Sequence, residues 1–108
     1  MKYSVISIPY FDKEFKKLAK KYPSLLDDIL VLSESLKANP LQGRSLGNSF
    51  YKVRMTIVSK GQGKSGGARV ITYIKVLGTT VYLASIYDKS EKSTITPKEL
   101  KEILNLIP

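Results

Sequence analysis

Hydrophobic residues recur at helical spacing in two stretches of the N-terminal third. In the first stretch, lysines fill the gaps between apolar positions that are four, three and four residues apart: Phe11, Phe15, Leu18 and Tyr22. This pattern predicts an amphipathic helix that ends before Pro23. In the second stretch, one apolar stripe predicts a helix from about Ser24 to Lys37, ended by Asn39-Pro40: Leu25, Ile29, Leu32 and Leu36. Two helices with so short a link form a hairpin, and we expect a sheet to cover their apolar stripes.

Alternating patterns follow in the rest of the chain and predict β-strands. Hydrophobic and polar side chains alternate from Tyr51 to Ile57, and the side chains of residues 68–77 divide between two faces with the same period of two. A tight-turn signal at Gly78-Thr79 separates this run from a third predicted strand in residues 80–87. The β-branched run in residues 3–8 predicts a further strand, ended by a proline. Residues 41–50 contain two glycines and an asparagine, and we expect a loop there.

The C-terminal segment carries the signals of a helix start. Thr96 stands at the N-cap position, Pro97 at the first helical position, and Glu99 where a capping-box acid belongs. The predicted order of elements is β-α-α-β-β-β-α, without repeats or a linker. We therefore predict one α+β domain over residues 1–108. It is an antiparallel β-sheet meander with the N-terminal helical hairpin packed on one face and a C-terminal helix.

Composition excludes several classes of protein. The 108 residues include no cysteine and no histidine, so disulfides, thiolate metal sites and imidazole ligands are impossible. We predict no metal and no cofactor. The apolar stretch near the N-terminus is far shorter than a signal-peptide core or a membrane span. We therefore predict a cytoplasmic protein without membrane contact.

The positive charge is concentrated in the middle of the chain. Eight lysines and arginines and no acidic residue lie between Ser35 and Tyr87, so this stretch supplies +8 of the net charge of +9. Such one-sided charge favours a surface that binds a polyanion. A generally basic, soluble domain is the alternative interpretation of the charge alone.

The glycine-rich stretch from Lys60 to Arg69 imitates a nucleotide-binding loop. Residues 61–66 match G-x-G-x-x-G, and their Gly-Lys-Ser resembles the end of a P-loop. Both motifs deliver a phosphate to the N-terminus of a helix, whereas an alternating strand follows here, and Val58 stands where the P-loop needs a glycine. We therefore exclude nucleotide binding. The stretch is either a flexible hairpin loop or, with Lys64 and its basic neighbours, a backbone that a polynucleotide can approach closely.

Basic and aromatic side chains share one face of the predicted meander. Cations that hold phosphates and rings that stack on unpaired bases make a platform for RNA, although the same residue types are common on any half-buried sheet. A cluster after the last strand favours the functional interpretation: Tyr87, Lys89, Glu91 and Lys92. The RNA-binding residues that we predict on the strands and the glycine-rich stretch are Lys52, Lys60, Lys64, Tyr73 and Lys75.

Two segments carry a resemblance to a known family. GKSGGARVITYI and, after a turn, VYLASIYDKSEKSTITPKEL resemble the RelE/HigB superfamily of type II toxins, in particular its HigB-like, phage-related branch. The resemblance is specific from Tyr51 to Leu104. It implies a RelE-like fold and a small ribosome-dependent mRNA endonuclease, an mRNA interferase that inhibits translation. The expected partners are mRNA, the ribosome and a cognate HigA/RelB-like antitoxin that holds the toxin inactive.

The resemblance also implies site residues. RelE-type toxins carry basic residues on the strand that matches Lys52 and Arg54. They carry an arginine where Arg69 stands and a basic residue where Lys89 stands. The tyrosine that some of them place near the terminal helix falls at Ile95 here, so its role is absent or has passed to a neighbour: Tyr87, Glu91 or Lys92.

Metal-independent RNA cleavage sets the chemistry that these residues must perform. The ribose 2′-OH attacks the phosphorus, which requires a base, an acid for the leaving 5′-oxygen and cations for the developing charge. Without histidine, the base must be an unusual one: other cations can lower the pKa of a lysine, and a tyrosine beside an arginine can ionise more easily. We hypothesise that Arg54 and Arg69 stabilise the phosphate. Lys89 or Lys92 assists with charge or proton transfer, and Tyr87 is an acid–base or stacking group.

Two other classes of function stay open from the sequence. ParE toxins share the architecture and act on DNA gyrase through protein contacts, although the basic groups on one face favour RNA. The missing tyrosine leaves room for a non-catalytic RNA-binding module. An antitoxin would have to mask the +8 stretch, so we expect an acidic segment laid across the sheet or a basic groove.

Overall fold

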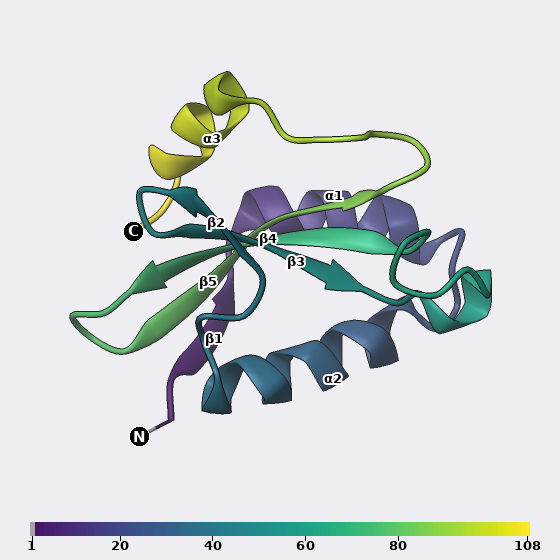
Figure 1. Cartoon of the computed structure of the whole chain (residues 1–108), viewed down its shortest axis with the longest axis horizontal. Coiled ribbons are helices and arrows are strands. Elements are labelled where there is room, and N and C mark those ends of the chain that lie inside the picture. Colours follow the sequence, from purple (N-terminus) through teal and green to yellow (C-terminus); the bar gives the residue numbers. More distant parts are fainter. Residues whose placement is uncertain (1) are drawn as a thin grey trace.

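The computed structural model describes residues 2–108 and contains helices on both sides of a single sheet (Figure 1). In chain order the elements are β1 (Ser4–Ser7), α1 (Pro9–Ala19), α2 (Leu25–Ala38), β2 (Arg44–Gly47), β3 (Phe50–Met55), the short 3-10 helix η1 (Val58–Lys60), β4 (Ala68–Lys75), β5 (Thr80–Asp88) and α3 (Pro97–Leu104). This order agrees with the predicted one except for the additional strand β2. No helix within residues 2–108 is both long and apolar enough to cross a bilayer.

The strands form one mixed sheet in the order β1-β5-β4-β3-β2. The strands β2 to β5 pair antiparallel with their neighbours, as predicted for the meander, whereas β1 pairs parallel with β5. A parallel pair of strands needs a long connection, because a tight hairpin turn reverses the chain direction. Here the connection from β1 to β5 begins with the helices α1 and α2. The α+β class is confirmed, and the sheet is mixed rather than wholly antiparallel.

The segment that we predicted as a loop, residues 41–50, contains strand β2. This strand pairs with the first half of β3, with a register shift after Ser45. Gly47, Asn48 and Ser49 all have positive φ angles (85°, 51° and 68°) and make the reversal between the two strands. The prediction was wrong because a strand of four residues with a register shift is too short to show alternation.

The helix α1 takes the place of β1 along the outer edge of β5. The strand β1 ends at Ser7, Pro9 opens α1, and the helix then packs against β5. The Glu14 carboxylate accepts hydrogen bonds from the backbone N–H of Ile86 at 3.2 Å and from the hydroxyl of Ser85 at 2.8 Å. The helix thus satisfies polar groups at a strand edge that β1 does not reach.

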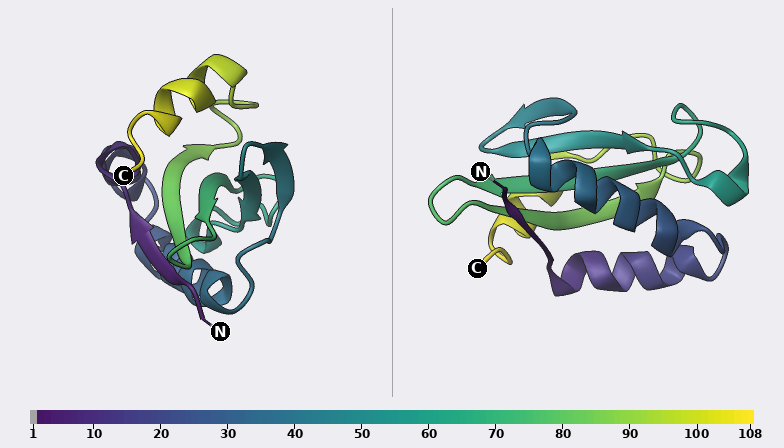
Figure 2. Two further views of the ribbon diagram at one scale, coloured as in Figure 1. Left: turned by 90° about the vertical axis from the view of Figure 1, so that its left-hand side faces the viewer. Right: turned by 90° about the horizontal axis from the view of Figure 1, so that it is seen from below.

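The helices α2 and α3 lie on opposite sides of the sheet (Figure 2). The predicted stripe of α2 is buried, and the predicted capping box of α3 forms between Thr96 and Glu99. Along β3, Val53 and Met55 are buried on the α2 side. Because side chains alternate along a strand, the basic residues of β3 project on the other face, as predicted.

A buried carboxylate ties the end of β5 to two loops. Asp88 accepts hydrogen bonds from Lys60 Nζ at 2.7 Å, from the Tyr22 hydroxyl at 2.6 Å and from the backbone N–H of Ser90 at 2.9 Å. Burial raises the pKa of Asp88, but these hydrogen bonds outweigh burial and hold the pKa well below its usual range. Because Asp88 directly precedes Lys89 and Lys60 opens the glycine-rich loop, this network positions both segments.

The free energy of unfolding of Tyr22→Phe is expected to decrease less at alkaline pH than that of the wild type. The hydrogen bond to Asp88 raises the pKa of Tyr22 to about 12, above its unfolded value of about 10. The protonated phenol therefore stabilises the fold below pH 10, and this contribution is lost as the pH rises toward 12. The difference in free energy of unfolding between wild type and Tyr22→Phe should be constant up to about pH 10 and shrink above it in urea denaturation. Tyr73→Phe is the control, because the ring of Tyr73 packs on Phe50. If its difference in free energy of unfolding from the wild type shrinks in the same way above pH 10, Tyr22 is not the cause.

Candidate functional site

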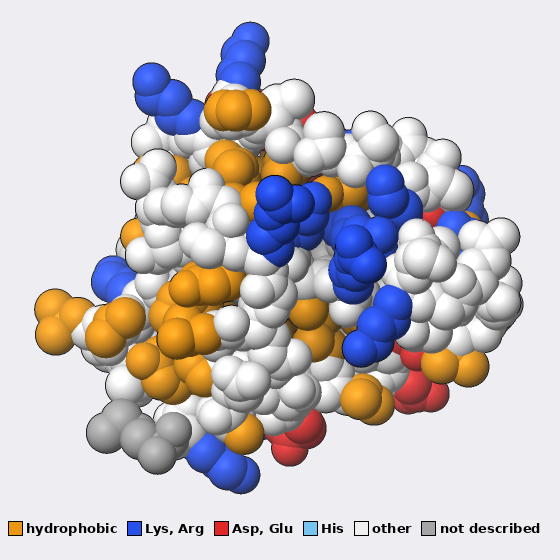
Figure 3. Space-filling model, viewed as in Figure 1, with side chains coloured by type: hydrophobic (Ala, Val, Ile, Leu, Met, Phe, Trp, Pro, Cys, Tyr) orange, Lys and Arg blue, Asp and Glu red, His pale blue; other side chains and the backbone are white. Residues whose placement is uncertain are grey.

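Six cations line one pocket on the sheet face opposite α2. The pocket has a volume of about 500 Å³, and its basic lining residues are Arg44, Lys52, Arg54, Lys64, Arg69 and Lys89. None of its lining residues is acidic, and Figure 3 shows lysine and arginine side chains gathered over the middle of this face. The pocket is therefore a strongly positive cavity, large enough for one nucleotide.

The pairing of neighbouring strands brings these cations together. Arg54 stands opposite Arg69 in the register of β3 with β4, and Arg44 stands opposite Lys52 in the register of β2 with β3. Like charges directly opposite each other destabilise an antiparallel sheet, by up to about 1 kcal/mol per pair. An anion bound between them would remove this repulsion, so the arrangement favours an anionic ligand.

Four acidic residues pair with lysines outside the pocket. The ion pairs found within residues 2–108 join Asp88 to Lys60, Glu91 to Lys21, Glu99 to Lys92 and Glu34 to Lys37. None of these four lysines lines the pocket. The fold thus leaves the pocket cations available for a ligand.

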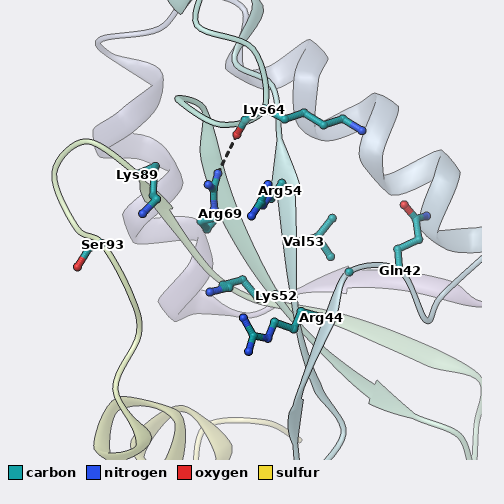
Figure 4. A pocket seen from close by; sticks show the side chains of 10 residues that line it. Gln42, Arg44, Lys52, Val53, Arg54, Lys64, Arg69, Lys89 and Ser93 are labelled. Atoms are coloured by element: carbon teal, nitrogen blue, oxygen red, sulfur yellow. Dashed lines mark hydrogen bonds between the residues drawn. The ribbon is translucent and has the colours of Figure 1, made fainter.

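Arg69 is buried and holds the glycine-rich loop beside the pocket. Its guanidinium donates a hydrogen bond to the carbonyl of Lys64 at 2.9 Å (Figure 4) and another to the carbonyl of Ser65 at 3.4 Å. Burial, and then the charge of Arg54, lowers the pKa of Arg69, although an arginine keeps its charge at neutral pH. The carbonyls fix the guanidinium in place before any ligand arrives.

The base of the glycine-rich loop packs tightly against β3 and β5. A Cβ on Gly67 would lie 2.1 Å from the carbonyl oxygen of Met55, so only glycine fits at this point. The carbonyl of Gly67 accepts a hydrogen bond from the backbone N–H of Lys89 at 3.0 Å. This contact sets Lys89 beside the pocket. The loop leads into β4 and not into a helix, as predicted.

Burial and the neighbouring cations lower the pKa of Lys52. The pKa of Lys52 is lowered first by burial and then by four charges: Arg44, Arg69, Lys89 and Arg54. A lysine with a lowered pKa holds a larger fraction of neutral amine near neutral pH and can accept a proton there. The sequence predicted a lysine crowded by cations. The structure provides one at Lys52, for which we had predicted RNA binding alone.

The chain matches one family of toxins over most of its length. The sequence model described as the RelE toxin of the RelE/RelB toxin–antitoxin system matches residues 9–107. This chain belongs to the RelE toxin family. The predicted membership of the RelE superfamily is thereby confirmed, whereas the HigB-like branch stays a prediction.

Two solved structures share the fold of this RelE-family toxin. One is the RelBE2 toxin–antitoxin complex from Mycobacterium tuberculosis, with a TM-score of 0.60 and 18% identity over 82% of this chain and 99% of that chain. The other is a doubly substituted mutant of Escherichia coli RelE in the free state, with a TM-score of 0.64 and 18% identity over 100% of both chains. At this level of identity, the likeness establishes the RelE fold alone.

Five predicted site residues of the RelE-family toxin meet in the pocket. Three come from the predicted catalytic set, Arg54, Arg69 and Lys89, and two from the predicted RNA-binding set, Lys52 and Lys64. Figure 4 shows Arg54, Arg69 and Lys89 grouped at the base of the glycine-rich loop, while the Lys64 side chain extends away from Arg69. The cations that we expected to converge therefore do converge.

Tyr87 and Lys92 lie outside the pocket. The Tyr87 hydroxyl is buried and has no hydrogen-bond partner among residues 2–108. Burial raises the pKa of Tyr87 and outweighs the opposite effects of Lys92 and Arg69, so the idea that this phenol ionises easily was wrong. Lys92 donates a hydrogen bond to Glu99, which raises the pKa of Lys92 although burial lowers it. Ile95, at the position of the family tyrosine, is buried in the core.

Three residues that we predicted to bind RNA also lie elsewhere. Lys60 is paired with Asp88, Tyr73 packs edge-on against Phe50, and the Lys75 ammonium donates to the carbonyl of Pro108 at 3.1 Å. None of the three lines the pocket. We therefore confine the proposed RNA site to the pocket residues.

Three further residues with polar or charged side chains line the pocket although no sequence pattern singled them out: Gln42, Arg44 and Ser93. Arg44 counted toward the charge of the central stretch, but it stands on β2, inside the segment that we expected to be a loop. Cross-strand pairing places it next to Lys52. A correct prediction of β2 would have identified Arg44 as a site residue.

Proposed function

We propose that this RelE-family toxin is a metal-independent endoribonuclease that cleaves mRNA on the ribosome and is held inactive by a RelB-like antitoxin. The observation that carries the proposal is the pocket that joins six cations without an acidic lining residue. Its size suits one nucleotide with its phosphate. Membership of the RelE family supports the ribosome as the place of action and an antitoxin as the partner.

Lys52 is the candidate general base. Its lowered pKa increases the fraction of neutral amine, which takes the proton from the ribose 2′-OH, and the 2′-oxygen then attacks the adjacent phosphorus. The bond from the 2′-oxygen to phosphorus forms while the bond from phosphorus to the 5′-oxygen breaks. The Lys89 ammonium, which lines the same pocket, donates the proton that the leaving 5′-oxygen takes up. The products are a 2′,3′-cyclic phosphate and a 5′-hydroxyl end.

Two arginines stabilise the charge that develops on the phosphoryl oxygens. Arg54 and Arg69 stand opposite each other on β3 and β4, so both guanidinium groups reach the same phosphate. Arg69 is held by the loop carbonyls before the substrate binds, which reduces the reorganisation needed at the transition state. The repulsion between the two arginines falls when the phosphate enters.

Incubation of the purified protein with ribosomes that carry a defined mRNA tests this function. We expect new 5′ ends within codons at the decoding site, mapped by primer extension, and we expect these ends to carry hydroxyl groups. A 5′-hydroxyl end is expected because the 2′-oxygen is the nucleophile, and polynucleotide kinase labels such an end directly. New ends that carry a 5′-phosphate would contradict the mechanism.

Two other results would replace the proposed function. Binding of mRNA without new 5′ ends would indicate a non-catalytic RNA-binding module. Relaxed plasmid that persists in a gyrase supercoiling assay, again without mRNA cleavage, would indicate a ParE-like toxin.

A further inference from the structure

An apolar groove lies beside the cationic pocket. This α2–β3 groove has a volume of about 320 Å³, and its apolar lining consists of Val31, Leu32, Val53, Met55 and Val58. Leu32, Val53 and Met55 are buried, whereas Val31 is 72% exposed and Val58 is 68% exposed. Two apolar side chains on different elements thus face solvent across one cavity.

The edge of β3 is uncovered along this groove. The last residue of β3 that pairs with β2 is Lys52, so among residues 2–108 no strand pairs with Val53, Arg54 and Met55 on that side. An uncovered strand edge presents backbone donors and acceptors to another chain. The groove is therefore suited to an extended peptide segment.

The groove adjoins the cationic pocket. Four residues line both cavities: Gln42, Val53, Arg54 and Lys64. The acidic residue of the groove, Asp28, is already engaged, because its carboxylate accepts hydrogen bonds from the Ser24 hydroxyl at 2.7 Å and from the backbone N–H of Val58 at 3.2 Å. A chain that leaves the groove toward the pocket meets cations without acidic competitors.

We propose that a segment of the antitoxin occupies the α2–β3 groove in an extended conformation, places an apolar side chain between Val31 and Val58, and continues with acidic residues into the cationic pocket. The cations of the groove, Arg54 and Lys64, also line the cationic pocket, so the part of the groove formed by Val31 and Val58 offers the phosphates of an RNA no charge. The inference rests on the proposed function, from which it takes the antitoxin as partner. The segment covers Arg54 and Lys64 and so blocks the site of mRNA cleavage.

Titration of the isotope-labelled toxin with a synthetic peptide, followed by NMR, tests this proposal. The probe is a blocked decapeptide with alternating threonine and leucine in one half and glutamate in the other, used in both orders. We expect amide shifts from Val53 to Val58 as well as in the cationic pocket. Replacement of the leucines by alanine should weaken binding by about tenfold or more, since burial of apolar side chains drives the contact.

Matched variants separate the groove from other exposed apolar positions. Val31→Gln/Val58→Gln should lower the affinity of the toxin for the leucine peptide to its affinity for the alanine peptide. Val76→Gln/Leu77→Gln alters the tip of the β4–β5 hairpin, where the side chains are 69% and 88% exposed, and should leave binding unchanged. Four outcomes would each overturn the proposal. The leucine and alanine peptides could bind with equal affinity, or the shifts could be confined to the cationic pocket. The peptide could fail to bind at millimolar concentration, or the toxin could self-associate through the groove.

The cleavage assay distinguishes failure of this inference from failure of the proposed function. Val31→Gln/Val58→Gln should cleave mRNA at the wild-type rate, because neither valine lines the cationic pocket. A toxin that binds the leucine peptide through the groove but cleaves no mRNA would refute the endoribonuclease and leave the groove intact. A toxin that cleaves mRNA but does not discriminate the peptides would refute the groove alone.

Discussion

Lys52→Arg is expected to lower the rate of mRNA cleavage by about 100-fold or more and to remove its dependence on pH. Arginine keeps the positive charge of the pocket, but its guanidinium does not lose a proton in this pH range and cannot act as the base. The wild-type rate should rise with pH, because only the deprotonated amine of Lys52 accepts the 2′-OH proton. The rise should end below about 10.4, the pKa of an ordinary lysine, because burial and the neighbouring cations lower the pKa of Lys52.

Rates measured on programmed ribosomes at pH values from about 6 to 9, all below the ordinary lysine pKa of about 10.4, check this result. Arg69→Ala is the matched comparison, since it removes a cation that we propose to contact the phosphate and leaves the proposed base in place. We expect it to lower the rate at every pH without removing the rise. A Lys52→Arg protein that keeps the rising limb would place the base elsewhere. Intact cleavage and growth arrest in Arg69→Ala would exclude the role assigned to that arginine.

Lys60→Met is expected to lower the free energy of unfolding by about 3 kcal/mol or more, because removal of one partner leaves a buried charge uncompensated. The side chains of Lys60 and Asp88 are 10% and 0% exposed, and they meet at 2.7 Å. Asp88 stabilises the fold above its unfolded pKa of about 3.9, and this contribution is lost as the pH falls toward its depressed folded pKa. Loss of Lys60 raises that folded pKa, so acid unfolding of Lys60→Met should begin at a higher pH.

Chemical denaturation with two companion variants checks the assignment of Lys60. Lys64→Met removes an exposed lysine from the same loop and should change stability by less than about 0.5 kcal/mol. Lys60→Met/Asp88→Leu removes both charges and should recover part of the lost stability. Normal stability of Lys60→Met together with weak cleavage would instead support the RNA-binding role that we predicted for Lys60 from the sequence.

Much of the fold follows from local patterns in the sequence. The stripe of α2 recurs at helical spacing, so its apolar side chains occupy one face whatever covers them. The capping box of α3 needs only residues 96–99, which are adjacent in the chain. In the same way, the spacing of two residues between Lys52 and Arg54 places both on one face of β3. These features are local and need no knowledge of the partner elements.

The composition of the pocket was decided by the tertiary structure. Lys60 and Lys64 look equivalent in the glycine-rich stretch, yet the fold pairs Lys60 with buried Asp88 and leaves Lys64 at the pocket. Arg44 joins the site only because the short strand β2 pairs with β3.

The sequence by itself determined the helices, the three central strands and the concentration of positive charge, because periodicity and charge are properties of neighbouring residues. Which cations share one pocket, whether the pKa of Lys52 is lowered and whether Tyr87 is exposed depend on strand register and burial. Those quantities join residues that are far apart in the chain, and only the folded structure specifies them.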